Sequence, residues 1–381
     1  MPFQLTEEQK MVRLLARDFA KKELEPVASQ RDREEIFPLD VVKKMGELGL
    51  LGMMVPVEYG GDGAGAVSYC LALQEIAYAC ASTAVTMSVA NLSTEPLLKF
   101  GDEAQKSKYL GRLAQGELLG CFALTEPGAG SDPGSLVLEA QADGDHYRIN
   151  GTKTFITHGQ YADVVNLIAR TGPEKGSKGL SAFIVEKGTP GFTVGSKEDK
   201  MGLRASNTVE LHFNDCVVPK ENLLGNLGSG FKIAMIALDS GRIGIASQAL
   251  GITRACLDES LRYAKDRKQF GRSISSFEAI QWMLADMATG IEAAYWLVLS
   301  AARRKDQDLP FTKEASMAKL FASELANKSA YLALQIHGGY GYLKDFKVER
   351  LYRDARATSI YEGTSEIQRL VIAKNLLKEQ N

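Results

Sequence analysis

The chain has 381 residues, a length that predicts two or three domains. Apolar residues make up 45% of it and charged residues 24%, values typical of a globular protein with a sizeable core, so extensive disorder and a collagen-like fold are excluded. The 45 basic and 47 acidic residues give a net charge of −2 and form no basic stripe, so nucleic acid is not an expected partner.

The sequence shows no metal-binding or disulfide pattern. None of the five cysteines forms a Cys-x-x-Cys pair and none of the four histidines pair at helical metal spacing, so we expect reduced thiols and no metal site. The segment Met1–Glu8 is acidic and has neither the apolar core of a signal peptide nor the Arg-rich pattern of a transit peptide. We therefore expect a cytoplasmic protein, or a mitochondrial matrix protein if the chain is a processed form.

The first 120 residues are predicted to form a helical domain. Thr6 followed by Glu8 and Gln9 predicts a capping box at the start of a helix, and residues 43–51 and 69–86 also have helical patterns. Residues 76–94 carry no charge over 19 positions, a length close to that of a membrane-spanning helix. Because seven of these side chains are Ser, Thr or Asn, we predict no membrane insertion and a helix that is buried or lines a pocket.

Residues 121–228 have the pattern of a β domain. Short runs rich in β-forming residues alternate with turn signals such as Asn150-Gly151, and apolar side chains occupy every second position at Val209, Leu211 and Phe213. This pattern predicts an antiparallel β-barrel or sandwich, and we take the central antiparallel β-barrel as the predicted fold. Strands are expected over the ranges 136–138, 147–149, 153–157, 164–169, 180–185 and 209–213.

Residues 229–381 are predicted to form a C-terminal helical domain. Only Pro310 occurs after Pro219, so long helices are possible, and apolar residues recur at three- and four-residue spacings. We expect helices over 231–265, 277–302, 312–336 and 365–378, which together suggest a four-helix bundle. The predicted fold class is therefore α+β multidomain, with boundaries at 1–120, 121–228 and 229–381.

The Gly-rich segment Thr125–Gly134 matches neither common nucleotide-binding loop. It lacks the Gly-Lys-Ser/Thr end of a phosphate loop, and Pro133 stands where a dinucleotide fingerprint needs glycine. Two interpretations stay open at this point. The segment is either a plain turn between domains, or a loop whose backbone N–H groups and hydroxyls contact a cofactor.

Glu362 is the candidate catalytic group that the residues themselves suggest. It follows Ile360 and Tyr361, and a carboxylate among apolar groups has a raised pKa that suits a general base near neutral pH. Gly363 lets a ligand approach the backbone closely. The alternative is that Glu362 is an acid that favours the dipole of the helix that follows it.

Five segments together resemble the acyl-CoA dehydrogenase family, and the sequence is most similar to its short-chain, butyryl-CoA type. The helical, β and helical order covers the whole chain, so the resemblance implies the three-domain fold of that family. The segments, in chain order, are Ala123–Asp132, Lys200–Ser206, Arg267–Gly271, Gln335–Gly341 and Tyr361–Arg369.

The resemblance implies that the protein binds FAD and forms a homotetramer, a dimer of dimers. It places Phe122, Leu124, Thr125, Gly130 and Ser131 against the isoalloxazine ring and phosphates, with Phe155, Ile156 and Thr157 along the flavin face. It places Arg267, Phe270, Gln335, Gly338 and Gly339 of a neighbouring subunit against the pyrophosphate and adenine, and Thr364 and Glu366 over the cofactor. Glu278 departs from the family, since relatives often carry Gln there, and an acid is unfavourable beside an FAD phosphate.

The resemblance also implies the reaction, which is dehydrogenation of an acyl-CoA substrate to the trans-2-enoyl-CoA. Glu362 would take the α-proton while a hydride passes to flavin N5, and an electron-transferring flavoprotein would then accept the electrons. Ser131, Asp239, Arg242 and Gly363 would hold the thioester arm. Val85 stands near the place where glutaryl-CoA-type relatives carry an Arg, which disfavours a dicarboxylic substrate, whereas Glu95 near the pocket floor has no explanation from the sequence.

Three alternatives remain at this stage. An acyl-CoA oxidase would use oxygen instead of a flavoprotein, and the packing around the flavin decides which acceptor reacts. A flavin monooxygenase on this fold usually lacks the base, so Glu362 disfavours it. A non-catalytic family member would be expected to have lost the base or a flavin motif, and the sequence retains both.

Overall fold

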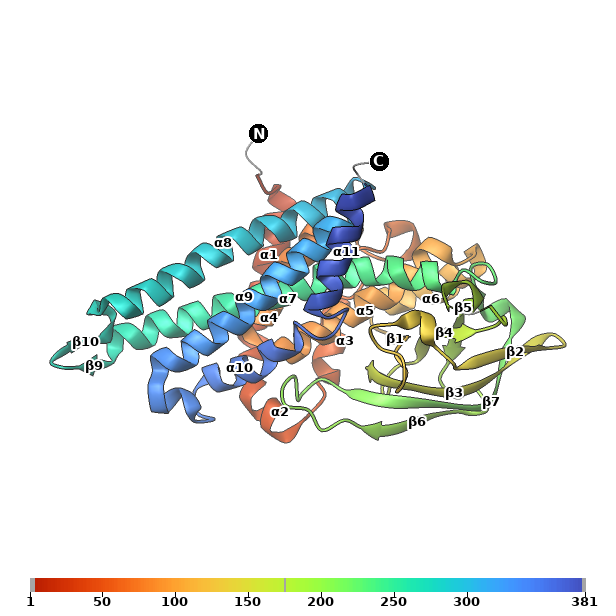
Figure 1. Cartoon of the computed structure of the whole chain (residues 1–381), viewed down its shortest axis with the longest axis horizontal. Coiled ribbons are helices and arrows are strands. Elements are labelled where there is room, and N and C mark those ends of the chain that lie inside the picture. Colours follow the sequence, from red (N-terminus) through yellow and green to blue (C-terminus); the bar gives the residue numbers. More distant parts are fainter. Residues whose placement is uncertain (1–3, 175, 379–381) are drawn as a thin grey trace.

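The computed structural model describes residues 4–174 and 176–378, and Figure 1 shows a layer of helices with a β-sheet at one end. The N-terminal helices are α1 (Glu7–Phe19), continued by a π-helical turn, α2 (Ala28–Glu34), α3 (Leu39–Glu47), α4 (Gly65–Ala79), α5 (Ala81–Phe100) and α6 (Glu103–Ala114). The predicted capping box is confirmed: the Thr6 hydroxyl accepts from Gln9 N at 3.1 Å, and Thr6 N donates to the Gln9 side chain at 3.0 Å.

The helix expected over residues 69–86 is interrupted, and that prediction is wrong at one residue. Cys80 has an extended backbone (φ −151°, ψ 107°) between α4 and α5. The break is held from outside, because Arg350 donates to Ala79 O at 3.2 Å and Gln248 donates to Ala81 O at 2.9 Å. Almost every residue of α5 is buried, as predicted for the uncharged stretch.

Three Ser and Thr side chains of α5, those of Thr86, Ser93 and Thr94, bond to its own backbone. Thr86 Oγ1 donates to Ser82 O at 3.0 Å, and Thr94 Oγ1 donates to Asn91 O at 2.8 Å. These bonds satisfy hydroxyls that would otherwise be costly to bury. No helix in the described part of the chain is long and apolar enough to cross a membrane.

The middle region is an open mixed sheet, so the predicted closed antiparallel barrel is wrong. Seven of its eight strands follow the order β6-β7-β3-β2-β4-β5-β8, and the eighth, β1, pairs with β4 beside this path. Both β1 and β2 pair parallel with β4. Alternation along a strand fixes which side chains face the core, but not which edges meet, so the sequence could not decide closure. The strands are β1 (Gly120–Ala123), β2 (Glu139–Asp143), β3 (His146–Thr157), β4 (Val164–Arg170), β5 (Leu180–Glu186), β6 (Phe192–Lys197), β7 (Thr208–Pro219) and β8 (Leu223–Leu224).

The predicted strand positions are otherwise close to those observed. The two halves of the sheet enclose one apolar core that includes Ile149, Leu167, Phe183 and Leu211. The exception is the range 136–138, which is not a strand but the coil that leads into β2. That coil matters for the site, because a buried carboxylate holds it.

The C-terminal region is helical, as predicted. The long helices α7 (Gly230–Asp266), α8 (Glu278–Asp306) and α9 (Thr312–His337) lie side by side, and α11 (Ser365–Lys378) packs on α9 (Figure 1). Strands β9 (Lys268–Gln269) and β10 (Arg272–Ser273) form a hairpin between α7 and α8, and α10 (Lys347–Ala357) was not predicted. Helices α4 and α5 also pack on α7, so one apolar core joins the N-terminal and C-terminal helices.

Candidate active site

Glu362 lies in a tight turn between α10 and α11. Both Glu362 (φ 53°) and Gly363 (φ 86°) have left-handed backbones, a conformation that is uncommon for a residue with a side chain. Buried donors hold the two carbonyls of this turn. Gln368 Nε2 donates to Glu362 O at 3.1 Å and to Gly363 O at 2.9 Å, and Lys319 Nζ donates to Gly363 O at 2.7 Å.

The Glu362 carboxyl group is buried against α7. A Cβ added to Gly241 would overlap this carboxyl group, so glycine at that position leaves the space that Glu362 occupies. Glu362 Oε2 is inaccessible to solvent and has no hydrogen-bond partner among the described residues. Burial raises the pKa of Glu362 to about 7, although the positive charges of Arg242 and Lys319 act in the opposite direction.

These contacts favour the base interpretation of Glu362 over the helix-dipole interpretation. The carboxyl group faces Gly241 of α7, and no N–H of the first turn of α11 is bonded to it in the described structure. A carboxylate that is unpartnered and has a pKa near neutrality can take up a proton from a neighbouring atom. Catalytic carboxyl groups commonly combine these two properties.

Side chains from three helices surround the turn, and sequence reasoning missed them. The Tyr361 hydroxyl donates to Gln248 Oε1 on α7, and the Tyr69 hydroxyl of α4 donates to Ser88 Oγ of α5 at 3.1 Å. A Cβ on Gly244 would overlap the Tyr69 and Ser88 hydroxyls. Spacing within α7 could have placed Gly241, Gly244 and Gln248 on one face, but nothing in the sequence ties that face to Glu362.

Asp239 and Arg242, which are three residues apart in α7, form a buried ion pair and not an exposed one. Arg242 Nη1 lies 2.5 Å from Asp239 Oδ1, and Thr312 Oγ1 donates to the other carboxylate oxygen at 2.5 Å. Arg242 Nε is buried without a partner in the described structure. The Arg242 guanidinium therefore keeps one N–H donor without a partner, and its positive charge acts to lower the pKa of Glu362.

The buried Glu95, which the sequence left unexplained, has an ionic partner. Lys305 Nζ lies 2.7 Å from Glu95 Oε2 and also donates to Ser240 Oγ at 2.5 Å. Ser240 is next to Asp239 in α7, so the two ion pairs are neighbours. Glu95 is thus part of the charged framework beneath α7, where its cost of burial is offset by Lys305.

The Gly-rich loop is fixed to the sheet by a buried ion pair, which a plain linker turn would not need. Lys153 of β3 is fully buried and donates to Glu126 at 2.8 Å and to Leu124 O at 2.9 Å. The Glu126 carboxylate also accepts from Val137 N at 2.7 Å and from Leu138 N at 3.0 Å. Both ends of the loop are therefore tied to one carboxylate.

The residues predicted to contact the flavin from one chain lie together around this loop. Phe155 is at a bulge of β3, has φ 57° and is 64% exposed, which is unusual for a large apolar side chain. A Cβ on Gly128 or Gly130 would meet no atom within 4 Å, so space remains beside the loop. Leu124 and Ile156 are buried, Phe122, Thr125 and Thr157 are half-buried, and Gly130 and Ser131 are exposed.

A second group of predicted cofactor residues lies at the opposite end of the helical layer from the sheet (Figure 1). Arg267, Gly338 and Gly339 line a cavity of about 530 Å³ between the end of α9 and the β9–β10 hairpin. Phe270, at the tip of that hairpin, is 93% exposed, and Gln335 is exposed as well. One chain therefore does not bring this group to Phe155, whereas Thr364 and Glu366 lie next to Glu362.

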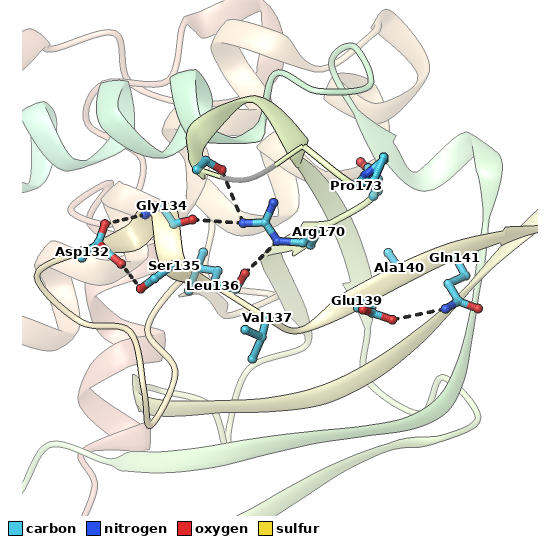
Figure 2. Close-up of a pocket in the computed structure, with 13 residues that line it drawn as sticks. Asp132, Gly134, Ser135, Leu136, Val137, Glu139, Ala140, Gln141, Arg170 and Pro173 are labelled. Atoms are coloured by element: carbon cyan, nitrogen blue, oxygen red, sulfur yellow. Dashed lines mark hydrogen bonds between the residues drawn. The ribbon is translucent and has the colours of Figure 1, made fainter.

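The larger cavity of about 720 Å³ lies beside the Gly-rich loop and is shown in Figure 2. Its basic residue is Arg170, and the guanidinium is already bonded to backbone carbonyls. Arg170 donates to Leu136 O at 2.9 Å, to Gly134 O at 3.0 Å and to Glu174 O at 2.5 Å. Arg170 therefore holds the backbone of the segment that follows the Gly-rich loop.

Three family models match the chain in succession and leave few residues outside them. The acyl-CoA dehydrogenase N-terminal domain matches residues 6–117, the middle domain matches residues 121–216, and the C-terminal domain matches residues 228–377. These matches follow the same order as the helical, sheet and helical regions of the structure.

Individual relatives agree with the family models. The chain is 54% identical over 376 residues to the mouse mitochondrial short-chain specific acyl-CoA dehydrogenase, which is 98% of this chain and 91% of that protein. The structure of butyryl-CoA dehydrogenase from Megasphaera elsdenii superimposes with a TM-score of 0.97 at 46% identity, covering 99% and 100% of the two chains. A chain in a structure on the electron transferring flavoprotein of Acidaminococcus fermentans gives a TM-score of 0.98 at 49% identity over 99% and 100%. The chain belongs to the acyl-CoA dehydrogenase family.

Proposed function

We propose that this protein dehydrogenates a short-chain acyl-CoA thioester to the trans-2-enoyl-CoA, with FAD as its cofactor. The single observation that carries the proposal is the Glu362 carboxyl group, whose oxygen Oε2 is buried without a hydrogen-bond partner among the described residues and whose pKa is raised to about 7. Removal of an α-proton from a thioester needs a base of this kind. The relatives that act on short acyl-CoA substrates, named above, support the substrate class.

The described residues fit a flat aromatic cofactor beside the Gly-rich loop. Phe155 presents an exposed ring, and Gly128 and Gly130 leave open space on the loop. Bound FAD would supply the acceptor for the hydride that leaves the β-carbon. The residues of one chain that would hold it are Phe122, Leu124, Thr125, Gly130, Ser131, Phe155, Ile156, Thr157, Thr364 and Glu366.

The second predicted group would hold the cofactor from another copy of the chain. Arg267, Phe270, Gln335, Gly338 and Gly339 lie too far along the helical layer to share a site with Phe155 of the same chain (Figure 1). An Arg is well suited to a diphosphate, since its fork donates two parallel bonds. We therefore propose that a homotetramer is the active form.

The substrate arm would be held by Ser131, Asp239, Arg242 and Gly363. Arg242 has a free Nε donor, and its charge also favours the ionised form of Glu362. The backbone of Glu362 and Gly363 is fixed by Gln368 and Lys319, so the carboxyl group is positioned before substrate arrives. Electrons would leave to an electron-transferring flavoprotein, the protein with which one structural neighbour was studied.

The test of the proposal is the variant Glu362→Gln, with Glu47→Gln on the exposed end of α3 as the control. Gln fills the same space but cannot take a proton, so we expect kcat with butyryl-CoA and an artificial acceptor to fall at least about 100-fold. Bound FAD, measured by its visible absorbance, should stay at the wild-type level. Turnover of Glu362→Gln at the rate of the control would refute the proposed base.

The electron acceptor that reoxidises the flavin distinguishes a dehydrogenase from the alternative, an oxidase. Reduced enzyme is mixed with air-saturated buffer or with an electron-transferring flavoprotein, and the return of flavin absorbance is followed in stopped flow. We expect fast reoxidation by the flavoprotein and slow reoxidation by oxygen. The reverse order of the two rates would identify an oxidase.

A further inference from the structure

Lys319 of α9 is a buried lysine that lies beneath the Glu362 turn. Its side chain is among the largest fully buried ones in the described structure, with 0% exposure. Its ammonium nitrogen lies 2.7 Å from the carbonyl oxygen of Gly363, the residue after Glu362. A lysine is rarely buried completely, so this position requires a reason.

The reason is not an ion pair. No carboxylate oxygen lies within 4.0 Å of the Lys319 ammonium in the part of the chain that the structure describes, in contrast to the other fully buried lysine, Lys153. The groups that act on Lys319 are the carboxylates of Glu362, Glu324 and Glu366 and the guanidinium of Arg242. Burial lowers the pKa of Lys319 to about 8, which leaves the ammonium largely protonated at neutral pH.

The hydrogen bond to Gly363 places this charge at the start of the turn. Glu362 and Gly363 both have left-handed backbones, so the direction of the Glu362 side chain depends on how the turn is held. Gln368 from α11 and Lys319 from α9 hold it from two helices. Gln368 supplies neutral donors, whereas Lys319 also supplies a positive charge.

We infer that Lys319 is a positioning residue for the general base: it anchors the Gly363 carbonyl and favours the ionised Glu362 carboxylate. The inference rests on the proposed function, because it assigns Lys319 a part in the reaction that Glu362 starts. Glu362 is also faced by Arg242 of α7, Tyr69 of α4 and the neighbouring Tyr361, and these groups remain in place when Lys319 is replaced. The effect of replacing Lys319 alone can therefore be measured as a change in the pH at which Glu362 ionises.

Three substitutions separate the two contributions of Lys319. Lys319→Arg keeps the charge, Lys319→Gln keeps a donor without charge, and Lys319→Met keeps only the volume. Lys328→Gln is the matched control, since Lys328 lies in the same helix, is exposed and pairs with Asp286 at 3.1 Å. Methionine is not expected to prevent folding, because it removes a buried charge and Gln368 still bonds the Gly363 carbonyl.

The pH profile of kcat/KM with butyryl-CoA is the main measurement. Without the positive charge Glu362 ionises at higher pH, so we expect the acid limb in Lys319→Gln and Lys319→Met to move up by about one pH unit. We also expect kcat at its optimum to fall roughly tenfold in Lys319→Met, where the anchor is lost as well. Lys319→Arg and Lys328→Gln should keep the wild-type acid limb.

A second readout does not depend on turnover. The carboxyl band of Glu362 is obtained as the infrared difference between each protein and its own Glu362→Gln variant, recorded against pH. Its midpoint should move up by about one pH unit in Lys319→Gln relative to wild type. Unchanged midpoints and acid limbs in both Lys319→Gln and Lys319→Met would overturn the inference. Failure of the proposed function would show differently, as wild-type turnover in Glu362→Gln with the infrared shift intact.

Discussion

Two buried lysines, in two regions of the molecule, hold backbone carbonyls in different ways. Lys153 in the sheet bonds Leu124 O and pairs with Glu126, whose carboxylate accepts two further N–H groups. Lys319 in the helices bonds Gly363 O, and the nearby Glu362 carboxylate keeps an oxygen without a partner. In the sheet, the Glu126 carboxylate therefore has a lysine and two N–H groups as hydrogen-bond partners. In the helices, oxygen Oε2 of the Glu362 carboxylate has no hydrogen-bond partner among the described residues.

The difference shows how the chain separates structure from chemistry. The Glu126 carboxylate accepts from Lys153, Val137 N and Leu138 N, so Glu126 is suited to holding the Gly-rich loop. A carboxylate that is buried without partners has a raised pKa, and Glu362 is suited to proton transfer for that reason. The predictions below test this contrast through stability, from the largest expected effect to the smallest.

The largest effect is expected for Lys153→Met. It leaves the Glu126 charge buried without its cation, so we expect a loss of about 3–5 kcal/mol in the free energy of unfolding. The measurement is urea unfolding, with the double variant Lys153→Met/Glu126→Gln as the control. The double variant should recover part of the loss, and a loss below about 1 kcal/mol in the single variant would break the contrast.

A smaller effect of opposite sign is expected for Glu362→Gln. Because the pKa of Glu362 is raised from 4.5 to about 7 on folding, the folded protein binds more protons between these values, and stability falls as pH rises through them. Gln removes this cost, so we expect the variant to be about 3 kcal/mol more stable than wild type at pH 8 and nearly equally stable near pH 4.5. Thermal unfolding at the two pH values checks this, and an equal difference at both would be inconsistent with a buried titrating acid.

The smallest effect is expected for Lys328→Gln, which breaks the exposed pair with Asp286. Solvent screens that pair, so the free energy of unfolding should change by less than about 0.5 kcal/mol. Urea unfolding of this variant beside Lys319→Met compares an exposed and a buried lysine of one helix. A large loss in the unfolding free energy of Lys328→Gln would mean that burial does not distinguish the contributions of Lys319 and Lys328 to stability.

The sequence predicted most of the helices and strands and named Glu362 as the candidate base, but it could not predict the pairings across the chain. Period and capping located the long helices, and the neighbours of Glu362 indicated a raised pKa. The break at Cys80 could not be predicted because Arg350 and Gln248, which donate to Ala79 O and Ala81 O on either side of it, come from distant helices. Closure of the sheet, the partner of Glu95 and the place of Lys319 depend on the same kind of long-range contact.

The buried helix α5 has a consequence for how the interior is ordered. Ala, Ser, Thr and Val make up most of it, and the hydroxyls of Thr86, Ser93 and Thr94 donate to its own carbonyls. Such short side chains have few rotamers to lose, so folding this helix costs little side-chain entropy. This helix, which also carries the Glu95 that pairs with Lys305, is therefore expected to be rigid. Longer side chains placed in it would lose more conformational entropy on folding and would also need additional space.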